Sequence, residues 1–204
     1  MSRFTGPRLK KMRALGVELP GLSRKSIERR PYPPGQHGQA RKKKPSDFGR
    51  QLKEKQKLRF NYGLSERQFR RLMTEARASK VATGQKLLEL LERRLDNVVF
   101  RAGFAPTIPA ARQLVNHGHI TVNGRRVDIA SYRVGSGDVI RPRNKSLTLQ
   151  CITDSVENLS LARPDWMDYD AKKRVAQMKV VPTADSVPFP IEVQLVVEYY
   201  SKRM

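Results

Sequence analysis

The sequence predicts an α+β protein with a basic, extended amino-terminal arm, a helical body, and a module of two short helices and a small antiparallel β-sheet. Three observations support this prediction. Residues 1–46 are rich in Lys, Arg, Pro and Gly and lack a sustained hydrophobic period. Residues 47–92 have the spacing of amphipathic helices. Residues 93–153 change from helical spacing to strict alternation, and residues 154–204 form a carboxy-terminal segment with further strands.

Charge is the strongest compositional signal. The 204 residues include 41 Lys and Arg against 19 Asp and Glu, for a net charge of +22. Residues 1–60 alone carry 18 basic and 4 acidic side chains, a net of +14. Such an excess favours a polyanionic partner, and a hydrophobic share of 38% suggests that this partner orders part of the chain.

Several classes of protein are excluded. The apolar runs are too short to span a membrane, and the first residues lack the apolar stretch of a secretory signal. The single Cys151 excludes a disulfide framework and a cysteine zinc cluster, which fits a reducing compartment. Because Cys151 alternates with Leu147 and Leu149, we expect a strand at 147–151 with a buried thiol.

The arm contains one predicted helix, at residues 8–15, which ends at Gly16. The proline-rich residues 29–38 favour an extended path, and the basic block that follows cannot pack on itself. A solvated linker is one interpretation, and an arm lying along nucleic-acid phosphates is the favoured one. Tyr32 and His37 can stack on bases, although a packing role for Tyr32 stays open.

Three helices are predicted in the body. The first runs from Asp47 to Gly63, the second opens at a Ser65–Gln68 capping box, and the third starts at Thr83. Their charged residues Lys53, Lys57, Arg70, Arg71 and Arg77 are expected on outward faces, either solvated or in contact with RNA.

The module begins with a helix at 95–102 and a second helix capped by Thr107. Asn123-Gly124, between short apolar runs, predicts a hairpin with a type I′ turn. Asp96 is expected to hold Arg93 and Arg94 by hydrogen bonds. The polar residues outside the apolar pattern should share one surface: Arg112, Gln113, Asn116, His117, His119, Arg125 and Arg126.

The remaining residues predict strands and no catalytic site. A turn at 135–138 leads into a strand at 139–140, and further strands are expected at 178–180 and 193–197. No nucleotide-binding, metalloprotease or nucleophile motif is present. His117 and His119 have the wrong spacing for a metal pair on a helix, so we expect neither a metal nor a cofactor. Without a long recognition helix, folded RNA is a better ligand than duplex DNA.

The segment RLDNVVFRAGF, followed by ARQLVNHGHITVNGRRV, resembles the S4-type RNA-binding module. Nearly the whole chain resembles the small-subunit ribosomal protein family that gave this module its name, through SRFTGPRLKKMRALG, RRPYPPGQHGQARKKKPSDFGRQLKEKQKLRFNYGLSERQFRR, TGQKLLELLERRLDN and VVEYYSKR. Leu9 and Met12 stand where some members have zinc-binding cysteines, so the resemblance is to the zinc-free bacterial or plastid form.

The resemblance implies a helical body carrying an inserted module, with the carboxy-terminal segment returning to complete the body. It also implies a non-enzymatic primary binder of small-subunit ribosomal RNA at a multi-helix junction of the 5′ domain, which nucleates assembly and contributes to translational accuracy. The implied partners are this RNA, neighbouring ribosomal proteins such as S5, and mRNA where it enters the subunit. The implied location is the small ribosomal subunit, in the cytoplasm or, for an organelle-encoded chain, the plastid stroma.

The family's RNA-binding positions carry over to basic and polar residues of the arm, the helices and the module. They are Arg3, Arg8, Lys10, Lys11, Arg29, Arg30, Tyr32, Gln36, His37, Arg41, Lys42, Lys43, Lys44, Lys53, Lys57, Arg59, Arg70, Arg71, Arg112, Gln113, His117, His119, Asn123, Arg125 and Arg126. Two other functions stay open at this point, an RNA-modifying enzyme that uses the module as a clamp and a DNA-compacting protein.

Overall fold

The computed structural model describes residues 4–40, 44–201 and 203. It divides into two compact units. The first, Met1–Leu88 with Val187–Met204, is the helical unit, and the second, Glu89–Ser186, is the module unit. The predicted α+β class is confirmed, because the described residues form helices in both units and a five-stranded antiparallel sheet in the module unit.

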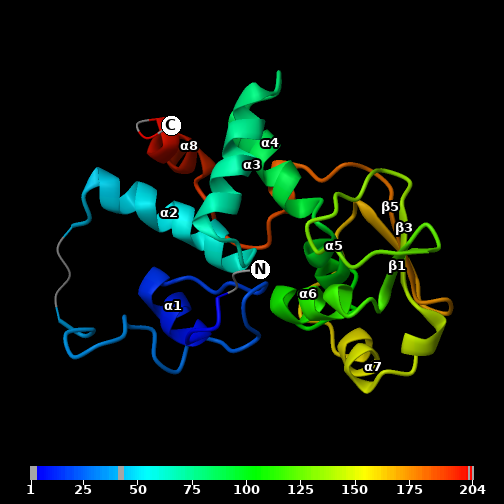
Figure 1. Cartoon of the computed structure of the whole chain (residues 1–204). Coiled ribbons are helices and arrows are strands. Elements are labelled where there is room, and N and C mark those ends of the chain that lie inside the picture. The colour runs from blue at the N-terminus through cyan, green and yellow to red at the C-terminus, as the bar shows by residue number, and fades with distance from the viewer. Residues whose placement is uncertain (1–3, 41–43, 202, 204) are drawn as a thin grey trace. The chain divides into compact units, whose positions relative to one another are not determined.

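The helical unit is built from α1 to α3, the first part of α4, and the carboxy-terminal α8 (Figure 1). Phe69 of α3 stacks on Tyr200 of α8 with 5.8 Å between ring centroids, and both side chains are buried. Gln51 of α2 donates a hydrogen bond to Glu198 of α8. These contacts join two segments of the chain that the whole module unit separates. The bounds are α1 Arg8–Leu15, α2 Asp47–Asn61, α3 Glu66–Ala78, α4 Thr83–Glu92 and α8 Val193–Ser201.

The beginning of the arm is packed and not extended. The predicted helix at 8–15 is confirmed as α1, and Gly16 ends it in the left-handed region with φ 64°. Met12, Leu15, Leu19 and Leu22 are buried. The backbone N–H of Gly21 also donates to the side chain of Asn61 on α2, at 3.0 Å. Residues 8–22 therefore contribute four apolar side chains to the core of the helical unit.

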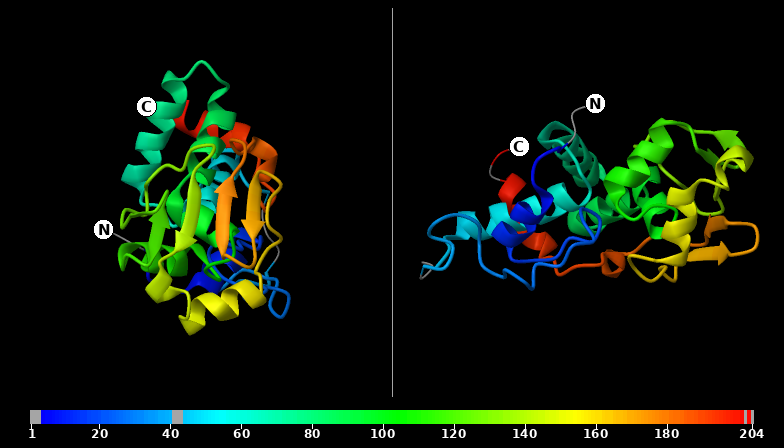
Figure 2. Two further views of the ribbon diagram at one scale, coloured as in Figure 1. Left: turned by 90° about the vertical axis from the view of Figure 1, so that its right-hand side faces the viewer. Right: turned by 90° about the horizontal axis from the view of Figure 1, so that it is seen from below.

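In the module unit, α5 and α6 precede a sheet of order β2-β1-β3-β5-β4, whose strands lie side by side in Figure 2. Ile120, Ile140 and Ala176 are fully buried on the inner face of the sheet. Phe104, just after α5, meets Tyr169 of β4 at 6.0 Å, which places the helices on that face. The bounds are α5 Leu95–Arg101, α6 Ile108–Asn116, β1 Ile120–Val122, β2 Arg125–Arg126, β3 Val139–Pro142, α7 Gln150–Glu157, β4 Met167–Asp170 and β5 Val175–Met178, with short 3-10 turns at Asn144–Ser146 and Ala184–Ser186.

Several local predictions are confirmed. Ser65 and Gln68 form the capping box of α3, and the Thr107 side chain accepts from the backbone of Ala110 at the start of α6. Asn123 and Gly124 have φ of 50° and 78°, as a type I′ hairpin turn requires. Each of these signals depends on residues only a few positions apart, so the packing of distant segments does not change it.

Two predicted strands are wrong. Residues 147–151 enter helix α7, and Cys151 is exposed on its first turn, because a five-residue alternation also fits a loop followed by a helix. Residues 193–197 begin α8, where Val196 and Tyr200 are buried one helical turn apart. A short apolar run does not distinguish a strand from a buried helix.

The strands of the carboxy-terminal segment also lie in a different place from the one expected. β4 and β5 extend the sheet of the module unit, and the strand expected at 178–180 is β5, which ends at Met178. The division into compact units falls within α4, after Leu88. Only Val187–Met204 returns to the helical unit.

Candidate nucleic-acid interface

The end of α6 and the hairpin form a polar surface on the module unit. Gln113, His117 and Arg125 are exposed, and the rings of His117 and His119 lie 6.1 Å apart. Gly118 lies against the guanidinium of Arg126, so closely that a Cβ at Gly118 would stand 2.3 Å from its Nε. The structure therefore brings the hairpin arginine beside the last turn of α6, as the sequence predicted.

A buried carboxylate, that of Asp96, fixes the position of the Arg112 side chain. Asp96 is fully buried and accepts hydrogen bonds from Arg94, at 3.1 and 2.8 Å, and from Arg112, at 3.0 and 2.6 Å. The prediction that Asp96 fixes Arg94 is confirmed, whereas Arg93 pairs with Glu89 at 2.9 Å. The Arg112 side chain is only 14% exposed, so this network sets its position.

Two further polar residues of the module have structural partners. The side chain of Asn123 donates to Asp138 at 2.7 Å and accepts from the backbone of Val139 at 2.8 Å, which joins the hairpin turn to the start of β3. His119 is half-buried and shares a hydrogen bond with Ser146 at 3.0 Å. Asn123 therefore acts first as a turn residue.

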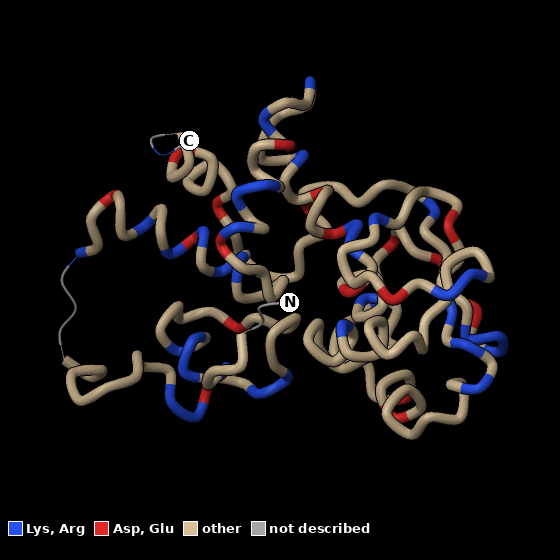
Figure 3. The backbone as a smooth tube through the Cα atoms, viewed as in Figure 1, with Lys and Arg blue, Asp and Glu red and all other residues tan. Residues whose placement is uncertain are grey.

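On the helical unit, the predicted basic residues separate into exposed and buried ones. Lys53, Arg70 and Arg71 are exposed, and Lys and Arg recur along α2 and α3 in Figure 3. Arg59 is half-buried and donates to the carbonyl of Leu64. The prediction that Lys57 faces outward is wrong.

Lys57 is buried in an ionic contact. Its ammonium lies 2.6 Å from Glu54 and donates to the carbonyl of Pro190 at 3.2 Å. Glu54 also accepts from the backbone of Glu192, so the pair anchors the segment before α8. The sequence spacing could not show this, because the covering segment lies more than a hundred residues away.

The arm contributes both exposed and packed residues. Lys11 lies over the rings of Phe4 and Phe60, at 5.9 and 5.4 Å. Tyr32 lies under the guanidinium of Arg13 at 5.0 Å, so the structure favours its packing role. The exposed arm residues are Arg8, Lys10, Arg29, Arg30, Gln36, His37 and Lys44. Arg3, Arg41, Lys42 and Lys43 lie outside the described residues.

Some basic residues near these surfaces were not expected from the sequence. Arg13 lines a cavity with Arg29 and Arg30, and Arg143 and Lys145 are exposed after β3, where Arg143 donates to the carbonyl of Gly118 at 3.4 Å. The run RPRNKS was the available signal for Arg143 and Lys145.

No helix among the described residues is long and apolar enough to cross a membrane, and no cluster of metal-ligating side chains occurs there.

Comparison with known proteins agrees with this arrangement. Residues 3–92 match the ribosomal protein S4/S9 N-terminal domain, and residues 93–140 match the S4 domain. The chain is 60% identical to small ribosomal subunit protein uS4B of Nitrosomonas europaea and to uS4 of Methylobacillus flagellatus, and 55% identical to uS4 of Acaryochloris marina, in each case over all of both chains. With this coverage and these two domains in order, the chain belongs to the uS4 family of small ribosomal subunit proteins.

Proposed function

We propose that this protein is a structural constituent of the small ribosomal subunit that binds its ribosomal RNA directly. The observation that carries this function is full-length identity to small ribosomal subunit proteins in a chain with a net charge of +22. The exposed basic side chains of the arm, of α2 and α3, and of the hairpin supply phosphate contacts from both units.

The finer assignment is the RNA target. We propose a multi-helix junction in the 5′ domain, bound early so that the protein nucleates assembly of the subunit body. Folded RNA suits the module, because its helices are short and present donors at their ends and at the hairpin turn, without a long helix for a major groove. Contacts with neighbouring proteins such as S5, and with mRNA where it enters the subunit, belong to the same proposal, as does a cytoplasmic or plastid location.

The experiment is binding of the purified full chain to a 5′-domain transcript at several salt concentrations. Several phosphate contacts predict a loss of about 10³-fold or more in affinity between 50 and 200 mM salt. Duplex DNA of equal length serves as competitor. Salt-insensitive binding, or displacement by duplex DNA as effective as by folded RNA, would contradict the assignment, and product formation on bare RNA would favour an RNA-modifying enzyme.

A further inference from the structure

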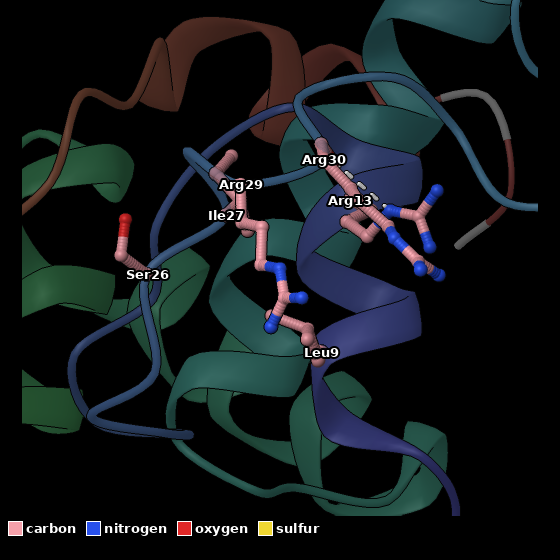
Figure 4. Close-up of a pocket in the computed structure, with 6 residues that line it drawn as sticks. All are labelled: Leu9, Arg13, Ser26, Ile27, Arg29 and Arg30. Carbon is pink, nitrogen blue, oxygen red and sulfur yellow. Dashed lines mark hydrogen bonds between the residues drawn. The ribbon is translucent and has the colours of Figure 1, made fainter.

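A cavity of about 250 Å³ lies in the amino-terminal part of the helical unit, between α1 and the loop at residues 26–30 (Figure 4). Leu9 and Arg13 of α1 form one side, and Ser26, Ile27, Arg29 and Arg30 form the other. All six residues belong to one compact unit. The cavity is therefore a property of the arm and α1 as they fold together.

Positive charge dominates this cavity. Three of its six lining residues are arginines, and no ion pair within the described residues joins Arg29 or Arg30 to a carboxylate. Two acids lie nearby: Glu28 within the loop is exposed and does not line the cavity, and Glu18 accepts from the Ser26 hydroxyl at 2.5 Å and from the backbone of Ile27 at 3.0 Å. These two bonds, of which that from the hydroxyl has the larger effect, lower the pKa of Glu18, and both are accepted by the same carboxylate oxygen. An anion that enters the cavity meets the guanidinium groups of Arg29 and Arg30, which form no ion pair among the described residues.

Arg13 holds the cavity in shape. Its Nε donates to the backbone carbonyls of Arg30 and Tyr32, both at 3.1 Å, and its guanidinium stacks on the Tyr32 ring. The loop is thereby attached to α1 at a fixed distance before any ligand arrives. A loop whose backbone is already fixed loses less conformational entropy when it binds an anion.

Each side of the cavity also contributes one apolar residue. Leu9 and Ile27 are half-buried and contribute hydrocarbon surface, and Figure 4 shows Arg29 extending from the loop toward Leu9. A bare phosphate gains nothing from such a surface, whereas a nucleobase can lie against it and stack on a guanidinium plane. The volume falls below the roughly 300–1,000 Å³ of pockets for drug-sized ligands, which limits the occupant to one nucleotide.

We propose that this cavity binds a single unstacked nucleotide of the RNA, with the phosphate at Arg29 and Arg30 and the base against Leu9 and Ile27. Arg13 is a positioning residue that keeps the loop on α1. The site deepens the proposed RNA-binding function and rests on it. It adds a contact to one base in a region where charge alone would predict only contacts to phosphate.

The test compares three variants of the full chain in transcript binding. Arg29→Gln with Arg30→Gln should lower the slope of log affinity against log salt by about 2, one for each phosphate contact. Ile27→Asn keeps every charge and should weaken binding about 10-fold with an unchanged slope, because it removes only the base contact. Lys172→Gln with Lys173→Gln removes an equal charge at adjacent exposed positions of the module unit and serves as the control.

Wild-type protein that fails to bind the transcript would overturn the proposed function itself. Wild-type binding with Arg29→Gln/Arg30→Gln matching the control, or with Ile27→Asn matching wild type, would overturn the nucleotide site alone. For Arg13→Lys, which keeps the charge but loses the two-carbonyl clamp, we expect weaker binding with the slope retained.

Binding of AMP and of inorganic phosphate to the free protein distinguishes a nucleotide site from a site for a bare anion. AMP should shift the side-chain NMR signals of Arg29 and Arg30 in the full chain more than inorganic phosphate at the same concentration. Equal shifts from both would reduce the site to a bare anion contact and contradict a base contact. Tight AMP binding together with unchanged transcript affinity of Arg29→Gln/Arg30→Gln would make it a free-nucleotide site, and would likewise overturn the RNA assignment.

Discussion

The hydroxyl of Tyr200 donates a 2.6 Å hydrogen bond to the carboxylate of Glu66, which joins the end of α8 to the start of α3. The same carboxylate accepts from Lys55 of α2 at 3.0 Å. The side chain of Glu66 thus connects three helices of the helical unit. Its partners Lys55 and Tyr200 are far apart in the sequence. Burial raises the pKa of Tyr200, and its bond to Glu66 raises it further, so Tyr200 stays a donor at physiological pH.

The first prediction concerns this bond. Tyr200→Phe keeps the ring stacked on Phe69 and removes only the hydroxyl. Because a hydrogen bond to a charged group contributes about 1.5–3 kcal/mol, we expect a loss of about 2 kcal/mol from the helical unit. Hydrogen exchange of α3 and α8 amides measures it. Tyr199→Phe is the control, because no hydrogen bond of the Tyr199 hydroxyl occurs among the described residues, and equal effects of the two variants would contradict the prediction.

The second prediction is the pH dependence of the same site. Burial alone would raise the pKa of Glu66, but the bonds from Tyr200 and Lys55 outweigh it, so the pKa lies below its ordinary value of 4.5. A carboxyl with a lowered folded-state pKa stabilises the fold above its unfolded pKa. This contribution should decrease as pH falls below about 4.5 and vanish below the folded pKa. The stability difference between wild type and Glu66→Gln should shrink over that window, and a constant difference would contradict it.

The third prediction tests the buried carboxylate of the module unit. Asp96→Asn removes the charge that holds Arg94 and Arg112, and loss of one partner of a buried ion pair costs about 3–5 kcal/mol. Trp166, the single tryptophan, lies in the module unit and reports its urea unfolding by fluorescence. Asp128→Asn removes an exposed carboxylate 3.9 Å from Arg126 and should change stability by less than about 1 kcal/mol.

The fourth prediction contrasts two lysines of one helix. Lys57→Ala leaves the carboxylate of Glu54 buried and unpaired, so we expect about 3 kcal/mol of destabilisation in the helical unit. Lys53→Ala changes an exposed side chain and should leave stability unchanged while it lowers the salt slope of RNA binding by about 1. Thermal melts and transcript binding measure the two effects. The reverse pattern would restore Lys57 as an RNA contact.

The fifth prediction uses the exposed thiol. Cys151 lies on the surface of α7, so one equivalent of a thiol reagent should react with the native chain without denaturant. The total after unfolding should stay at one equivalent. Slow labelling that requires urea would instead support the buried thiol expected from the sequence.

The sequence determined the features that depend on local chemistry. The capping box at Ser65, the stop at Gly16 and the hairpin at Asn123-Gly124 all follow from residue type and spacing within a few positions. Features that depend on distant segments were missed. The segment around Pro190 buries Lys57, and α8 packs on α2 and α3, so neither the burial of Lys57 nor the helical state of residues 193–197 can be read from its own neighbours.

The candidate site follows the same rule. The basic positions of the arm were visible as composition, but the cavity was not, because it requires Arg13 of α1 to meet a loop that starts thirteen residues later. Likewise, Arg112 was expected among the RNA contacts, and its attachment to Asp96 appears only once α5 and α6 are packed.

The helical unit consists of two segments separated by residues 89–186. A polypeptide is made from its amino end, so α2 and α3 leave the synthesising ribosome well before α8, and the module unit lies between them. During that interval Phe69 and Glu66 have no Tyr200 to meet, and the surface that α8 covers is open to water. The module unit can therefore fold before the helical unit is complete. The helical unit is completed only when α8 has been synthesised and packs on α2 and α3, which were made first.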